Sequence, residues 1–206
     1  DLSLELIKRI IKKDNLKLEV PSREEIVKCF EEFYFGGDPN KDSKYWSGSI
    51  VNEELLVDKK FFELLENNGI TWGFVSGAES ASAKFVLEKR LGLNSPPLIS
   101  MGDAPDKPNP KGFINLSKKI LGDKLGASNI PIAYVGDTIA DINTVINARK
   151  EIPSQKFVSI GIAPPHLHLE SRFKERISYE KNLQKAGADL ILNSINDLEN
   201  INLDLF

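Results

Sequence analysis

The chain has 206 residues, enough for one full domain or for a domain with a small addition. Hydrophobic residues make up 41% and charged residues 28%, and the formal net charge is -3. This charge argues against nucleic acid as the main partner, because binding to nucleic-acid phosphates needs clustered Lys and Arg. No apolar run approaches the roughly 18 residues of a membrane span, so we expect no membrane partner. The single cysteine, Cys29, excludes an internal disulfide and a cysteine-based metal site, which favours a reducing cytoplasm.

The first part of the chain has a helical pattern. Apolar spacing predicts a helix over residues 2–13 and a second helix that opens at Ser22 and ends before Gly36. Ser22 and Glu25 have the spacing of a capping box. Cys29 is expected to be a small core residue of the second helix rather than a nucleophile. It lies beside the apolar stripe that should form the buried face, which consists of Ile26, Val27, Phe30 and Phe33.

After Asp58, apolar strands alternate with helices. Helices are expected from Asp58 to Asn68, at about 80–91, 110–121 and 139–149, and up to Gly187, and strands at 70–75, 97–100, 132–135, 157–160 and 189–192. This alternation predicts an α/β fold with a doubly wound parallel sheet. Trp72 lies inside the first strand and should be a core residue. The sequence therefore predicts a small helical segment with its connecting loop at 1–57 and an α/β core at 58–206.

The first two strand ends are followed by residues that suit a phosphorylated ligand, because ligands of open α/β sheets bind at the carboxyl ends of strands. Ser76 and Gly77 follow the first strand, where a hydroxyl and helix-start amides could hold a phosphate oxygen; for an isolated Ser-Gly, a cap or turn role is the better alternative. Lys107 stands on a turn stiffened by two prolines, where a fixed ammonium can neutralise a phosphate. Lys111 is the rival cation, but it lies in the first turn of the helix that follows and should be solvated.

The third strand end carries two carboxylates. Asp137 comes where the strand ends, and Asp141 is four residues further on, so a helix places both on one face. Paired carboxylates at a strand end suit a hard cation such as Mg²⁺. The alternative is a capping Asp followed by an ordinary helical Asp. We favour the metal, because Asp141 would otherwise be a like charge close to Asp137 with no benefit to stability.

The order of these segments is specific: strand-Ser-Gly, then Lys-Pro-x-Pro before a helix, then strand-Gly-Asp-x-x-x-Asp. In this order the chain resembles the haloacid-dehalogenase-like superfamily, in the branch similar to phosphoglycolate phosphatases. The resemblance covers about residues 58–200, and the helical start is similar to the later part of that branch's cap. It implies a Mg²⁺-dependent phosphohydrolase that acts on a small phosphorylated metabolite. Ser76 and Gly77 would bind phosphate, Lys107 would stabilise charge, and Asp137 and Asp141 would bind the metal, with Asp137 as the direct ligand.

The family's first motif, Asp-x-Asp after an apolar strand, is not found in this chain. Asp1 is not preceded by a strand, and Asp103 and Asp106 have the wrong spacing. We therefore expect the natural protein to extend upstream with this motif on a central strand, between the strands that end at Ser76 and Asp137. Its carboxylate would form an aspartyl-phosphate, and this chain alone should be inactive. The alternatives are a phosphomutase of the same superfamily and a protein that binds phosphorylated ligands without turnover.

Two further pairs of residues have open roles. Tyr45 and Trp46, in the polar loop at 36–57, either shield the site and contact substrate or pack the cap segment, and packing is at least as well supported. His166 and His168 form a His-x-His pattern. A metal pair is conceivable, but no third ligand is evident, so we interpret them as histidines of a surface loop.

Overall fold

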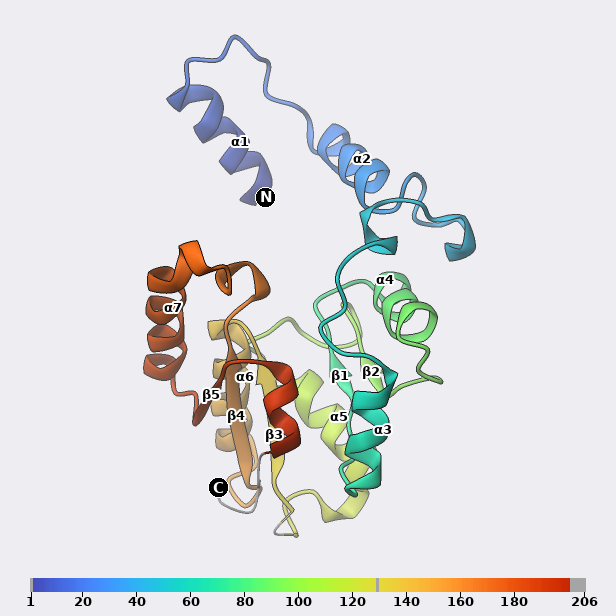
Figure 1. The fold of residues 1–206 in the computed structure, drawn as a ribbon, viewed down its shortest axis with the longest axis vertical. Helices are drawn as coiled ribbons and strands as arrows, with labels where there is room; N and C mark the ends of the chain where they lie inside the picture. Colours follow the sequence, from blue (N-terminus) through green and yellow to red (C-terminus); the bar gives the residue numbers. More distant parts are fainter. Residues whose placement is uncertain (1, 129, 201–206) are drawn as a thin grey trace. The chain divides into compact units, whose positions relative to one another are not determined.

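A computed structural model of the chain describes residues 2–128 and 130–200. The chain divides into two compact units, Asp1–Glu54 and Leu55–Phe206, whereas the sequence places the boundary after residue 57. Figure 1 shows the elements of both units in sequence colours. Within the described ranges, no helix combines the length and the apolar character that crossing a bilayer requires.

The first unit is helical. It contains α1 (Leu2–Lys13), α2 (Arg23–Tyr34) and two short 3-10 turns, η1 (Ser43–Tyr45) and η2 (Ser49–Val51). The predicted capping box is present at α2. The Ser22 hydroxyl accepts the N–H of Glu25 at 3.2 Å, and the Glu25 carboxylate accepts the N–H of Ser22 at 2.8 Å. The start of this helix is therefore determined by residues three positions apart.

The predicted buried face of α2 is not buried, which corrects the sequence interpretation: Ile26 and Val27 are half-buried, and Phe30 and Phe33 are exposed. None of the described residues of α2 is buried, and Phe30 and Phe33 keep 54% and 72% of their surface accessible. Cys29 is also exposed, so it is not a core residue. Periodicity identifies a face that can be buried but not the partner that covers it. The buried apolar side chains of this unit instead follow the helix: Phe35, Trp46 and Ile50.

Glycines let the chain turn back after α2. Gly36 has a φ of +79°, and Gly48 lies so close to the helix end that a Cβ there would be 2.3 Å from the Tyr34 carbonyl oxygen. The loop between them brings the rings of Phe35 and Trp46 together, with centroids 4.7 Å apart. The small core of the first unit is thus built by the loop rather than by the helix.

The second unit is an α/β domain with parallel strands, as predicted. Trp72 precedes the first strand instead of lying inside it, and it packs half-buried on Phe62, with ring centroids 4.8 Å apart. The elements in chain order are α3 (Lys59–Asn67), β1 (Phe74–Val75), α4 (Ser80–Lys84), η3 (Phe85–Arg90), β2 (Leu98–Ile99), α5 (Lys111–Leu121), η4 (Gly122–Lys124), β3 (Ile132–Gly136), α6 (Ile139–Glu151), β4 (Phe157–Ile162), η5 (Pro165–Leu167), η6 (Glu170–Arg172), α7 (Phe173–Ala186), β5 (Leu190–Leu192) and η7 (Ile195–Asn200).

Among the described residues, the strands form two parallel sheets rather than the single sheet that the sequence predicts. In the first, β1 pairs with β2, and Val75 lies opposite Ile99. In the second, the order is β3-β4-β5, and Gly136 at the end of β3 lies opposite Gly161. No described strand pairs with the second edge of β1 or of β3. The two edges are those between which the sequence analysis expects a central strand.

Helix α5 connects the two sheets. The ring of Phe113 on α5 packs against Tyr134 on β3 and Phe157 on β4, with centroid distances of 5.0 and 5.2 Å. Val75 of β1 packs against the same cluster. At Gly112, in the first turn of α5, a Cβ would lie 3.5 Å from Val75 Cγ1. Helix α5 therefore contacts both sheets (Figure 1). These contacts hold the carboxyl ends of β1 and β3 in one region.

Candidate functional site

Ser76 follows β1 at the carboxyl end of the first sheet. Its N–H donates to the Ile99 carbonyl at 2.8 Å, which extends the pairing with β2. Its hydroxyl accepts the N–H of Ala78 at 3.0 Å, so Ser76 has the turn role that the sequence left as an alternative. No acceptor in the described part of the chain takes the hydroxyl hydrogen, which leaves it available to a ligand. Gly77 is exposed beside it.

Lys107 stands on a turn that is fixed by a neighbouring helix. The peptide bond between Lys107 and Pro108 is cis. Asn147 of α6 donates through Nδ2 to the Pro108 carbonyl at 3.1 Å. The Lys107 side chain is 27% exposed, and its Nζ lies 2.6 Å from Oδ1 of Asp141. Lys111, the rival cation, is exposed and forms no ion pair with the residues that the structure describes, as expected for a solvated lysine.

Asp141 is buried, and both of its oxygens accept hydrogen bonds from the protein. Oδ1 accepts from Lys107 Nζ at 2.6 Å and from the Tyr134 hydroxyl at 3.2 Å. Oδ2 accepts from the N–H of Thr138 at 3.0 Å and from its hydroxyl at 2.6 Å, which completes a capping box at the start of α6. Burial raises the pKa of Asp141, but the hydrogen bonds from Lys107 and Thr138 and the charge of Lys107 outweigh burial and hold the pKa below its ordinary value.

The two predicted metal ligands therefore have different environments. Asp141 does stabilise the fold, contrary to the expectation from sequence, because it caps α6 and neutralises Lys107. With these donors in place, its carboxylate has little capacity left for a metal ion. Asp137 is exposed, and its carboxylate makes no hydrogen bond or ion pair with the described residues. Its backbone carbonyl accepts a hydrogen bond from the Tyr179 hydroxyl at 2.7 Å. Asp137 is the carboxylate that is open to a ligand.

Gly136 allows Asp141 to approach the end of β3. A Cβ at Gly136 would lie 2.3 Å from the Cβ of Asp141 and 2.5 Å from its Cγ, distances that real Cβ atoms essentially never show. The glycine of the Gly-Asp-Thr segment is thus required by the side chain of Asp141, which sits against the strand, and not by an unusual backbone conformation.

Tyr134 links the three predicted segments. Its hydroxyl lies 3.5 Å from the carbonyl oxygen of Val75, the residue before Ser76, and 3.2 Å from Asp141, which in turn holds Lys107. The structure therefore brings the ends of β1 and β3 and the Lys107 turn into one network. Sequence reasoning missed Tyr134, because a tyrosine in an apolar strand gives no signal of what its hydroxyl contacts.

Thr138 was also missed, although a signal for it exists. Thr138 and Asp141 have the Ser/Thr-x-x-acid spacing of a capping box directly before a helix, the same pattern that identified the start of α2. Applied to this segment, the pattern would have assigned Asp141 to the helix cap.

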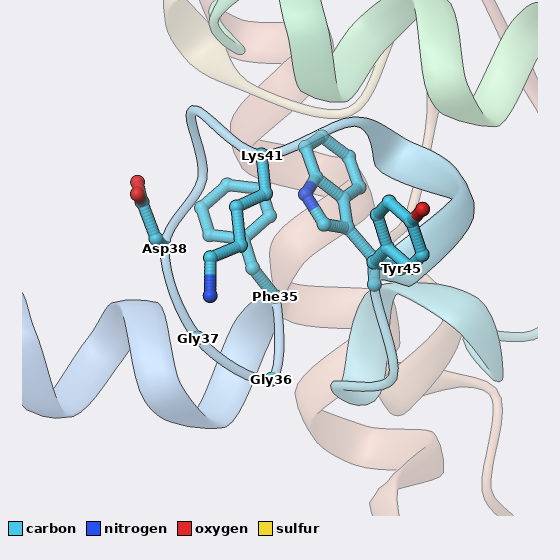
Figure 2. Close-up of a pocket in the computed structure, with 7 residues that line it drawn as sticks. Phe35, Gly36, Gly37, Asp38, Lys41 and Tyr45 are labelled. Carbon is cyan, nitrogen blue, oxygen red and sulfur yellow. The ribbon is translucent and has the colours of Figure 1, made fainter.

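The two aromatic candidates of the first unit have separate environments. Trp46 is buried against Phe35, which favours packing over contact with a substrate. Tyr45 is 68% exposed, and Lys44 Nζ lies 4.8 Å from its ring centroid. Figure 2 shows Tyr45 at the side of an open hollow, with its hydroxyl directed away from Phe35. The hollow has a volume of about 360 Å³ and is lined by Phe35, Gly36, Gly37, Asp38, Lys41, Tyr45 and Trp46.

The two histidines do not form a metal pair with a third ligand in the described residues. His168 is exposed, and its Nε2 contacts the Ala163 carbonyl at 2.8 Å; His166 is exposed as well. No group of three or more His, Cys, Asp or Glu side chains is arranged for a metal within residues 2–128 and 130–200. The positions of both residues fit the interpretation as surface-loop histidines.

No family model and no curated protein matches the chain. The function of the protein is therefore inferred from the geometry and chemistry of the residues described above.

Replacing Gly136 with Ala should destabilise the protein by about 1–3 kcal/mol, because the new Cβ overlaps Asp141 and must displace it from the cap and from Lys107. The midpoint of urea unfolding, with an unchanged slope, measures this loss. Gly77→Ala is the matched control. A Cβ at Gly77 would meet nothing within 4 Å, so its free energy of unfolding should stay within about 0.5 kcal/mol of wild type. Equal effects of the two changes would contradict the close approach at Gly136.

Asp141→Asn should destabilise the protein by about 2 kcal/mol at neutral pH. An amide accepts through its oxygen only, so it cannot serve the donors of Lys107 and Thr138 at the same time. Because the pKa of Asp141 is lowered in the folded state, its stabilisation is fully present above the ordinary pKa of 3.8 and is lost as the pH falls through the folded value. The difference between wild type and variant should therefore shrink below about pH 4.

Asp137→Asn is the control for this measurement, because the Asp137 carboxylate is exposed and has no described partner. Its free energy of unfolding should follow that of wild type from neutral to acid pH. A pH-independent difference between wild type and Asp141→Asn would show that the carboxylate is not held in its charged form by this network.

Proposed function

We propose that this chain provides the phosphate-binding and metal-binding part of a Mg²⁺-dependent phosphohydrolase that acts on a small phosphorylated metabolite. The observation that carries the proposal is the Lys107–Asp141 pair, which fixes an ammonium group at 2.6 Å from a buried carboxylate. This pair is linked to the carboxyl ends of parallel strands, where ligands of α/β sheets bind. The order of Ser76, Lys107 and Asp137 along the chain supports the haloacid-dehalogenase-like assignment.

Ser76 and Lys107 bind the ligand's phosphoryl oxygens in this proposal. The Ser76 hydroxyl accepts the N–H of Ala78 at 3.0 Å, so its hydrogen is available to an acceptor of the ligand. Lys107 supplies a positive charge that the buried partner holds in position. Once both groups have bound the ligand, they stabilise the charge on the transferred group without further reorganisation during the transfer step.

Asp137 suits one Mg²⁺ ligand. Its carboxylate is exposed at the end of β3 and is free of described partners, and Mg²⁺ is commonly bound by one or two carboxylates with substrate phosphate and water. Bound there, the metal would offset repulsion between an anionic nucleophile and an anionic phosphate. Asp141 would contribute through Lys107 rather than as a direct ligand, because its oxygens accept from Lys107, Tyr134 and Thr138.

The proposed nucleophile is an Asp on a further strand between β1 and β3. Each of these strands has an edge that no described strand pairs, although α5 holds both against one cluster. A parallel strand inserted there would satisfy backbone groups on both sides. Its carboxyl end would place an Asp-x-Asp motif beside Ser76 and Asp137. The first carboxylate would attack phosphorus, and the second would protonate the leaving oxygen and then activate water.

The test is Mg²⁺-dependent hydrolysis of an aryl phosphate by the protein made from its native gene. Lys107→Ala should lower turnover by at least about 100-fold, because it removes the charge that stabilises the transferred phosphoryl group. Lys111→Ala, four residues further on and exposed, should leave turnover unchanged. Metal-independent hydrolysis, or turnover that survives Lys107→Ala, would overturn the proposal.

Lys107→Ala also leaves Asp141 without its cation, so loss of folding must be separated from loss of function. The double variant Lys107→Ala/Asp141→Asn removes both charges of the pair. It should recover part of the stability that the single change loses and remain inactive. Recovery of activity together with stability would show that Lys107 serves the fold alone.

A further inference from the structure

Asp141 and a bound phosphate compete for the Lys107 ammonium group. At 2.6 Å from Asp141 Oδ1, the Lys107 ammonium is committed to a carboxylate whose side chain is only 4% exposed. When the ammonium turns toward a bound phosphate, Asp141 loses part of its compensation. A buried charge without donors is strongly unfavourable, so phosphate binding is weakened unless another group supports Asp141.

Tyr134 is placed to support it. Its hydroxyl has one hydrogen and two acceptors within reach, Asp141 Oδ1 at 3.2 Å and the Val75 carbonyl at 3.5 Å. The residue is 9% exposed, and its ring packs edge-on against Phe113 with centroids 5.0 Å apart. Burial and then the charge of Asp141 raise the pKa of Tyr134, so the hydroxyl keeps its hydrogen.

We propose that Tyr134 is a positioning residue that releases Lys107 to a phosphorylated ligand, by donating to the same Asp141 oxygen that Lys107 holds. This inference rests on the proposed function. The two donors share Oδ1, while Thr138 occupies Oδ2 in either state. As Lys107 moves away, the Tyr134 hydroxyl, which already donates to Asp141 Oδ1, becomes the donor that remains on that oxygen.

Removal of the Tyr134 hydroxyl alone should change the reactivity of Lys107 in one direction. Tyr134→Phe keeps the ring that packs on Phe113 and deletes only the donor to Asp141. The carboxylate then depends more on Lys107, so the Lys107 ammonium is held more tightly and reacts more slowly. A role in packing alone predicts the opposite, because loosening the structure exposes Lys107.

The experiment measures how fast acetic anhydride labels each lysine, read by mass spectrometry. The rate at Lys107 is divided by the rate at Lys111, which is exposed and lies in the same segment. Tyr134→Phe should lower this ratio by roughly three- to tenfold, the effect of losing one hydrogen bond of ordinary net strength. The matched control is Tyr179→Phe, whose hydroxyl bonds the Asp137 carbonyl instead, and it should leave the ratio unchanged. An unchanged or raised ratio in Tyr134→Phe overturns the inference.

A second arm adds inorganic phosphate. In the wild type, phosphate should slow labelling of Lys107 relative to Lys111, and Tyr134→Phe should need roughly three- to tenfold more phosphate for the same protection. Protection in the wild type with equal phosphate sensitivity in Tyr134→Phe overturns the role of Tyr134 and leaves the proposed function standing. No protection of Lys107 in the wild type overturns the proposed function, and this inference with it.

Discussion

A buried carboxylate is stable only where donors surround it, and the donors around Asp141 come from separate segments of the chain. Lys107 arrives from the turn before α5, Tyr134 from β3, and Thr138 from the start of α6. Each of these groups is held in place by the carboxylate in turn, so the carboxyl edge of the domain and its candidate site are one network. A change that serves ligand binding here also changes the stability of the fold.

This network explains why glycine precedes Asp137. The side chain of Asp141 packs against the end of β3 at a distance that excludes any Cβ at Gly136. The chain can then leave the strand with the Asp137 carboxylate exposed and the Asp141 carboxylate buried. The two acidic residues therefore have different roles: Asp137 faces the solvent, and Asp141 holds Lys107. Their separation avoids the like-charge repulsion that a shared metal site would have to offset.

The two units differ in how completely their apolar surfaces are covered. In the second unit, α5 packs Phe113 against both sheets, and Ile160 and Leu183 are fully buried. In the first unit, Phe30 and Phe33 of α2 are exposed, and burial is concentrated in the loop around Phe35 and Trp46. The amphipathic pattern of α2 therefore indicates only which face of the helix could pack against a partner. The capping box predicts where the helix begins.

Features that depend on residues close together in the chain can be read from the sequence. Capping determined the start of α2, the alternation of apolar strands and helices determined the parallel α/β unit, and the order of Ser76, Lys107 and Asp137 placed these residues at strand ends and a turn. Only the folded structure shows that Asp141 holds Lys107, because the two residues are 34 positions apart in sequence. It alone revealed Tyr134, whose hydroxyl reaches a carbonyl 59 residues away. It also shows that Phe30 and Phe33 of α2 are exposed, since burial depends on a covering partner that periodicity does not specify.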